Sequence, residues 1–81
     1  MNFLLFAYLL EKHGPRLTMD QLAIELGLAR NTVYNQVAAG TFSVATYVEG
    51  GKRWADARDV ASYLDACRAR AKTGDHAGSP A

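Results

Sequence analysis

The chain has 81 residues, of which 49% are hydrophobic and 21% are charged. One small globular domain fits this length and composition, whereas a second domain, or the thick core of a self-contained enzyme, does not. The formal net charge is +1 and Cys67 is the single cysteine, so the overall charge indicates no polyanionic partner and an intramolecular disulfide framework is excluded.

Residues 2–12 are apolar almost all the way round a helical wheel, and Gly14-Pro15 ends this pattern. The pattern predicts a helix that must be covered on most of its surface. Its apolar run, from Phe3 to Leu10, is far shorter than the roughly 20 residues that cross a bilayer, and it lacks the preceding basic residues of a signal peptide. We therefore expect this helix to belong to a folded cytoplasmic domain with no membrane partner.

Residues 18–39 show the pattern of a helix-turn-helix. Thr18 and Gln21 are spaced as a capping box, so a first helix is expected to begin here and to end at Gly27. The helical pattern resumes over residues 30–39. Two short helices joined by such a tight turn are typical of one class of DNA-binding motif.

The second half of the chain predicts a hairpin and a last helix. Residues 44–55 contain two strand-like runs around a Gly-Gly pair, which can adopt the positive φ angles of a tight turn. Asp56 is placed to cap a helix over residues 56–72. Residues 73–81 contain no large apolar side chain, and we expect them to be a disordered tail.

Five features follow one another between Leu17 and Asp65: a capped first helix, the turn and second helix ELGLARNTVY, an exit at Gly40, a hairpin ending in Gly-Lys-Arg-Trp, and a last helix capped by aspartate. This segment resembles the small winged-helix DNA-binding domains related to excisionases and MerR-type regulators. The whole chain, with FLLFA near its start and DVASYLD near its end, loosely resembles phage-associated regulators of the pyocin activator type. The resemblance implies a mainly α fold with a small β-hairpin: a winged helix-turn-helix plus an extra N-terminal helix, in one domain over residues 1–72.

The second helix of the helix-turn-helix carries polar residues on its predicted outer face. If Val33 and Val37 face the core, the outward and flanking positions hold five side chains able to contact bases or phosphates. They are Arg30, Asn31, Thr32, Tyr34 and Asn35. Asparagine can bond to adenine, arginine to guanine, and threonine to a base edge or a thymine methyl group, so this set suits a reader of the major groove. The alternatives are an ordinary solvated face and, for Tyr34, a packing role.

Lys52 and Arg53 follow the Gly-Gly turn, where the tip of a wing can contact phosphates. Alternatively, these charges protect an exposed strand edge from association. If Arg53 points outward, the alternation of side chains along a strand places Trp54 in the core. No acidic residue lies between Glu25 and Glu49, so the local charge is positive although the total charge is nearly neutral.

The N-terminal helix carries more apolar surface than a domain this small is expected to cover. We expect Phe3, Phe6 and Leu10 to contribute to a homodimer or higher homo-oligomer. The alternative is that the helix packs over the other helices as part of the core, and both arrangements can hold together.

The leading functional hypothesis is a sequence-specific double-stranded DNA-binding protein, a transcriptional regulator of a phage or mobile element associated with the nucleoid. One alternative is an excisionase-like recombination directionality factor. Another is a winged-helix protein-interaction module that does not bind DNA, which the nearly neutral charge favours.

Enzymatic activity is not expected, because the sequence has no phosphate-binding glycine loop, nucleophile elbow or acid/base pair. No cofactor or metal is expected either, since His13 and His76 are too isolated to act as ligands. Cys67 is interpreted as a small buried hydrophobic residue of the last helix.

Overall fold

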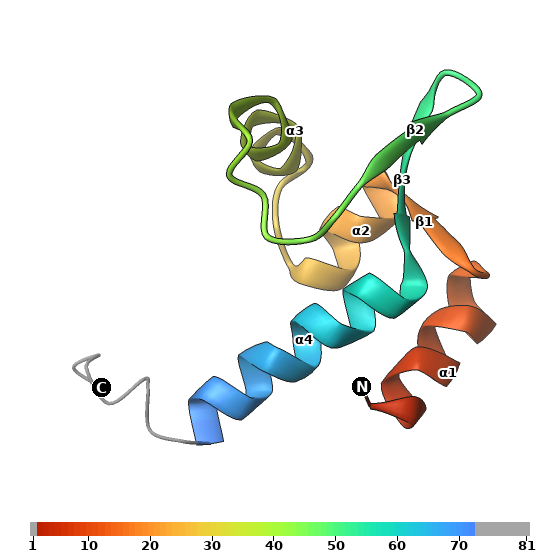
Figure 1. The fold of residues 1–81 in the computed structure, drawn as a ribbon, viewed down its shortest axis with the longest axis vertical. Helices are drawn as coiled ribbons and strands as arrows, with labels where there is room; N and C mark the ends of the chain where they lie inside the picture. Colours follow the sequence, from red (N-terminus) through yellow and green to blue (C-terminus); the bar gives the residue numbers. More distant parts are fainter. Residues whose placement is uncertain (1, 73–81) are drawn as a thin grey trace.

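The computed structural model describes residues 2–72, and Figure 1 shows the arrangement of its elements. In chain order these are α1 (Phe3–His13), β1 (Arg16–Thr18), α2 (Met19–Leu26), α3 (Arg30–Ala39), β2 (Tyr47–Glu49), β3 (Lys52–Asp56) and α4 (Ala57–Lys72). The strands form one antiparallel sheet in the order β1-β3-β2. The described chain is thus mainly helical with a small sheet, an arrangement compatible with a winged helix.

Helix α1 packs against α4 and the short strand β1. The side-chain carbonyl of Asn2 caps it by accepting two backbone N–H groups of the first turn, at 2.9 and 3.1 Å. Leu9 is fully buried and Phe6 is half-buried against the core. The predicted helix is confirmed, but the rest of the domain covers only one of its faces.

Helices α2 and α3 begin and end where the sequence predicts. Thr18 accepts a hydrogen bond from the Gln21 backbone N–H at 3.2 Å, and the Gln21 side chain accepts one from the Thr18 backbone N–H at 3.0 Å. Gly27 and Gly40 follow α2 and α3 with φ angles of 70° and 73°, a left-handed conformation that glycine adopts with little strain.

The core lies between α2, α3, the sheet and the first turns of α4. Its largest fully buried side chains come from five different elements. They are Leu9, Leu17, Leu22, Val33 and Val60. Because no element contributes more than a small part, the core depends on all of them being docked together.

β3 is the central strand of the sheet. β1 pairs with its second half, with Arg16 opposite Asp56 and Thr18 opposite Trp54, and β2 pairs with its first half. The hairpin is therefore confirmed, although β2 begins only at Tyr47. The sequence does not predict β1, because three residues after a proline are too few to show an alternating pattern.

Trp54 lies on the outer face of the sheet, so the prediction that it enters the core is wrong. Ala55 is the fully buried residue, and the alternation of β3 therefore turns Arg53 inward and Trp54 outward. The Arg16 guanidinium lies 3.9 Å from the indole centroid, and the indole N–H donates to the Glu49 carbonyl at 3.2 Å. The small Ala55 side chain lets β3 approach the helices closely, and the large ring is accommodated outside.

Asp56 caps α4 as predicted, because its carboxylate accepts the backbone N–H of Arg58 at 2.8 Å. Val60 is fully buried, whereas the later turns of α4 extend beyond the core (Figure 1). Cys67 is only half-buried, which corrects the prediction of a buried position. The expected disorder of residues 73–81 lies outside the described residues.

Candidate nucleic-acid interface

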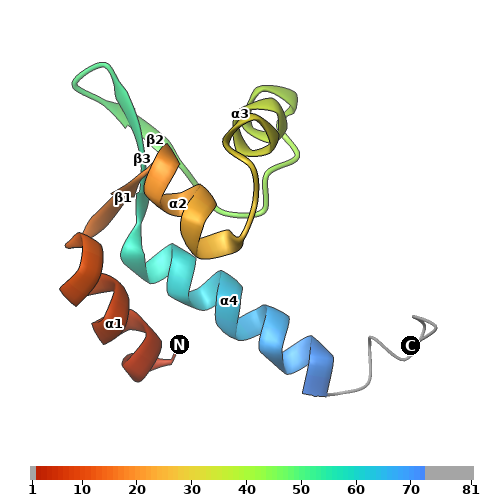
Figure 2. The same ribbon diagram turned by 180° about the vertical axis from the view of Figure 1, so that it is seen from behind.

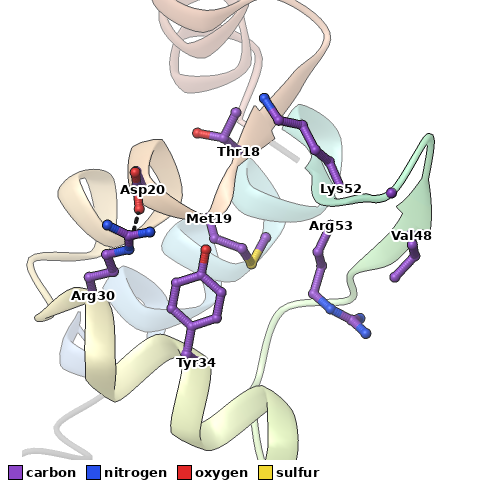
Figure 3. A pocket seen from close by; sticks show the side chains of 9 residues that line it. Thr18, Met19, Asp20, Arg30, Tyr34, Val48, Lys52 and Arg53 are labelled. Atoms are coloured by element: carbon purple, nitrogen blue, oxygen red, sulfur yellow. Dashed lines mark ion pairs between the residues drawn. The ribbon is translucent and has the colours of Figure 1, made fainter.

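A groove opens between α3 and the β2–β3 hairpin, with the start of α2 at its floor (Figure 3). We call it the α3–hairpin groove; its volume is about 510 Å³. Its polar and charged lining residues are Thr18, Asp20, Arg30, Tyr34, Lys52 and Arg53. The structure thus brings together four of the residues that the sequence predicts to contact DNA, from two segments about 20 residues apart in the chain.

Arg30 and Tyr34 form the helical side of the groove. Arg30 begins α3 and Tyr34 follows one turn later, so both side chains project from the same side of the helix. The Arg30 guanidinium lies 5.5 Å from the centroid of the tyrosine ring, and its Nε lies 2.9 Å from Oδ1 of Asp20. The ion pair is well exposed and therefore weak, but it directs Arg30 toward the groove.

Lys52 and Arg53 form the hairpin side. Arg53 is half-buried, and its guanidinium points toward the loop between α3 and β2, with Nη1 donating to the Thr46 hydroxyl at 2.9 Å. The Lys52 ammonium lies 5.7 Å from the Trp54 ring centroid, on the outer face of the hairpin. The two cations therefore occupy opposite faces of the hairpin near its tip.

Asp20 is the charged lining residue that sequence reasoning missed. An acidic residue in the first turn is expected at any helix start, so nothing in its position alone marks it. The usable signal is the helix-turn-helix pattern, which brings the starts of α2 and α3 close enough for Asp20 to reach Arg30. The side chains of the groove then carry three positive charges and one negative charge.

The remaining predicted contact residues of α3 lie outside this groove. Asn31 and Asn35 are exposed and Thr32 is half-buried. Val33, on the opposite side of the helix, is fully buried, which confirms the predicted orientation of α3. Most of the predicted residues therefore divide into a set that lines the α3–hairpin groove and a pair of asparagines on the outer face of the helix.

Helix α1 lies at the other end of the molecule from α3 and the hairpin tip (Figures 1 and 2). Phe3 and Leu10 are 77% and 38% exposed, and Leu4 is also exposed. Phe6 packs against the core instead. Of the residues predicted to mediate oligomerisation, Phe3 and Leu10 thus belong to an exposed apolar stripe and Phe6 lies at its margin.

His13 forms an ionic cluster that joins α1 to α2. Its Nε2 lies 2.7 Å from a carboxylate oxygen of Glu25, and the Lys12 ammonium lies 3.0 Å from the same oxygen. The Tyr8 hydroxyl donates to Glu25 as well, at 3.1 Å. The side chains of His13 and Glu25 are 6% and 8% exposed. Burial raises the pKa of Glu25, but the hydrogen bonds from these three partners outweigh it and hold the pKa below its ordinary value of 4.5.

The stability of the protein is expected to fall in acid because of Glu25. A carboxylate whose pKa is lowered by folding contributes stability above its ordinary pKa of 4.5 and loses it as the pH falls through the lower folded value. Glu25→Gln should therefore be less stable than the natural chain at pH 7, by about 1 to 3 kcal/mol, and the difference should shrink below pH 4.5. Urea unfolding followed by circular dichroism at several pH values measures this. Glu11→Gln, at an exposed position of α1, is the control, and equal acid sensitivity of both variants would contradict the assignment.

Within residues 2–72, no three His, Cys, Asp or Glu side chains are grouped as a metal site requires. No helix in that part of the chain combines the length and apolar character needed to cross a bilayer. No family model, curated protein or solved structure matches the chain.

Proposed function

We propose that this protein binds double-stranded DNA, with the outer face of α3 in the major groove and the β2–β3 hairpin over the adjacent phosphates. The observation that carries the proposal is that Arg30 and Arg53 line the α3–hairpin groove from two separate segments, with Lys52 at its margin on the outer face of the hairpin. Cations gathered from two separate segments beside an exposed polar helix face are what a reader of duplex DNA needs.

The dimensions of the elements support this docking. Helix α3 has 10 residues and is therefore about 15 Å long. Its outer face carries the short side chains of Asn31, Asn35 and Ala38, so the helix can enter a major groove about 12 Å wide. The phosphate strand bordering that groove then passes between α3 and the hairpin, where Arg30 and Arg53 lie.

Local charge supports binding in spite of the total charge of +1. Asp20 opposes a phosphate, but its carboxylate is paired with Arg30 at 2.9 Å. Glu49 is bonded to Arg16, which lies over Trp54 on the outer face of the sheet. The inner side of the hairpin therefore presents Arg53 to DNA with no hairpin carboxylate beside it.

In biological terms we propose a sequence-specific transcriptional regulator of a phage or other mobile element, on the strength of the family resemblance. An excisionase-like recombination factor uses the same contacts, and the genes next to the coding sequence distinguish the two roles. A promoter bound by the protein supports the regulator, and a neighbouring integrase gene supports the recombination factor.

Self-association through α1 is part of the proposal. The stripe of Phe3, Leu4 and Leu10 is exposed and lies away from the α3–hairpin groove (Figure 2), so a second copy bound there leaves both grooves open. The same stripe supports the alternative function, a protein-interaction module, because exposed contiguous apolar side chains often mark a binding surface.

Arg53→Ala tests the proposed function. Loss of one phosphate contact should weaken binding to any duplex about tenfold at about 50 mM salt, and should reduce the slope of log K against log salt by about one unit. Fluorescence anisotropy with a random duplex and with the DNA upstream of the gene measures both quantities. Arg68→Ala removes the same charge from an exposed position of α4 and should change neither quantity appreciably.

Equal binding by the Arg53→Ala variant and the natural chain at every salt concentration would contradict the role of the hairpin. If the natural chain binds neither duplex at low salt, the protein-interaction function replaces the proposal. Changes at Phe3 should then abolish function, whereas changes at Arg53 should not.

A further inference from the structure

The outer face of α3 is a surface of two asparagines and one alanine. Val33 is fully buried, and at 100° per residue the positions nearest the opposite side are Asn31, Asn35 and Ala38. All three are exposed. Arg30 projects toward Asp20 at the start of α2 instead, as Figure 3 shows.

The carboxamides of Asn31 and Asn35 have no partner within the described part of the chain, whereas two other amides have structural roles. Asn2 caps α1 and Gln21 completes the capping box of α2. Asparagine in a helix interior lowers helix stability, and Asn35 lies in the interior of α3. A free carboxamide at this position therefore does not stabilise the helix, but it is available to recognise a binding partner.

The chemistry of this face favours adenine over guanine. A carboxamide offers one donor group and one acceptor, which match N6 and N7 of adenine in the major groove. Guanine presents two acceptors there and is read by arginine or lysine. The one cationic residue of α3 is Arg30, and its Nε is held 2.9 Å from Asp20 at the edge of the α3–hairpin groove.

The spacing of the asparagines sets the spacing of the bases. Asn31 and Asn35 are four residues apart, so their Cα atoms lie about 6 Å apart along a helix that rises about 1.5 Å per residue. Successive base pairs are about 3.4 Å apart. Ala38 lies about 4.5 Å further along, and its methyl group suits contact with the methyl group of thymine.

We infer that the protein recognises an A·T core in which Asn31 and Asn35 each bond to an adenine, about two base-pair steps apart, and Ala38 contacts a thymine methyl group just beyond. This inference rests on the proposed function. It assigns sequence preference to the outer face of α3 and general affinity to the cations of the groove.

Selection from a randomised duplex pool with the full chain tests the inference. The natural chain should enrich adenine at two positions about two steps apart. Asn31→Ala should remove the preference at one of these positions and Asn35→Ala at the other, each by about 5- to 100-fold in discrimination. Gln36→Ala, on the half-buried side of the same helix, is the matched control and should retain both preferences.

Replacing each selected adenine by 7-deazaadenine gives a second readout, because this base lacks the N7 acceptor. The substitution should weaken binding of the natural chain but not of the variant that lacks the corresponding asparagine. If Asn31 or Asn35 had only a structural role, the effect of 7-deazaadenine on binding would not depend on which asparagine is present. Thermal unfolding of each variant confirms that it is folded.

The outcomes separate the inference from the function on which it rests. Enrichment of G·C pairs, or A·T preferences unchanged in both asparagine variants, would overturn the inference and leave DNA binding intact. Failure of the natural chain to retain any duplex at low salt would overturn the proposed function together with the inference.

Discussion

Leu22→Ala is expected to lower the free energy of unfolding by about 2 to 5 kcal/mol, because it removes a large side chain from a closely packed core. Leu22 is fully buried on α2, a helix that packs against α3 and the strands β1 and β3. A domain of this size has a total stability of only about 4 to 12 kcal/mol, so the variant should be partly unfolded at room temperature or close to it.

Urea unfolding monitored by circular dichroism measures this loss, and thermal unfolding should show a midpoint lower by at least about 8 °C. Ile24→Ala is the control, because Ile24 lies on the same helix but is 69% exposed. Its effect should stay within about 0.5 kcal/mol. Similar losses in the two variants would contradict the placement of Leu22 in the core and of Ile24 on the surface.

The double variant Lys52→Ala with Arg53→Ala is expected to bind DNA about a hundredfold more weakly at about 50 mM salt, since the proposed interface would lose two phosphate contacts. The slope of log K against log salt should fall by about two units. The folded state should be little changed, because Lys52 is exposed and Arg53 is half-buried with one hydrogen bond, to Thr46.

Anisotropy titrations over a series of salt concentrations, with equal-length random and upstream duplexes, provide the measurement. The matched control carries Arg68→Ala and Arg70→Ala, which remove the same number of charges from α4. Because the total charge is equal in the two double variants, a larger loss for the hairpin variant locates the binding site. Equal losses would indicate that only total charge matters and would contradict the assigned interface.

Elements specified by neighbouring residues are predictable from the sequence. The capping box of Thr18 and Gln21, the glycine exits of α2 and α3, and the cap at Asp56 all depend on contacts within a few residues. Their boundaries therefore agree with the prediction.

Features that depend on distant partners are not predictable in this way. Strand β1 exists because Arg16–Thr18 pairs with residues 54–56, which lie about 40 positions later in the chain. The position of Trp54 depends on which β3 residue the helices approach, and Ala55 occupies that place. A single sequence shows the alternation of a strand but not which of its two faces becomes buried.

In the candidate site, too, features set by neighbouring residues are predictable from the sequence and features set by distant partners are not. The polar face of α3 follows from helical periodicity once Val33 is placed in the core. The pairing of Arg30 with Asp20 arises only when α2 and α3 dock against each other. The position of Arg53 in the groove beside α3 arises only when the hairpin packs next to these helices. The cluster around Glu25 is likewise a tertiary contact between α1 and α2.

The pairing register of β3 gives the hairpin an uneven stiffness. Strand β1 supports β3 only from Trp54 to Asp56, whereas Lys52 and Arg53 pair with β2 alone. A two-stranded ribbon has little stability of its own. The hairpin is therefore rigid at its base, where three strands pair, and flexible at its tip, where only two strands pair. If the proposed function holds, the cations of the hairpin can follow variations in the width of a DNA groove while α3 stays fixed on the core, and general affinity and sequence reading then adjust independently.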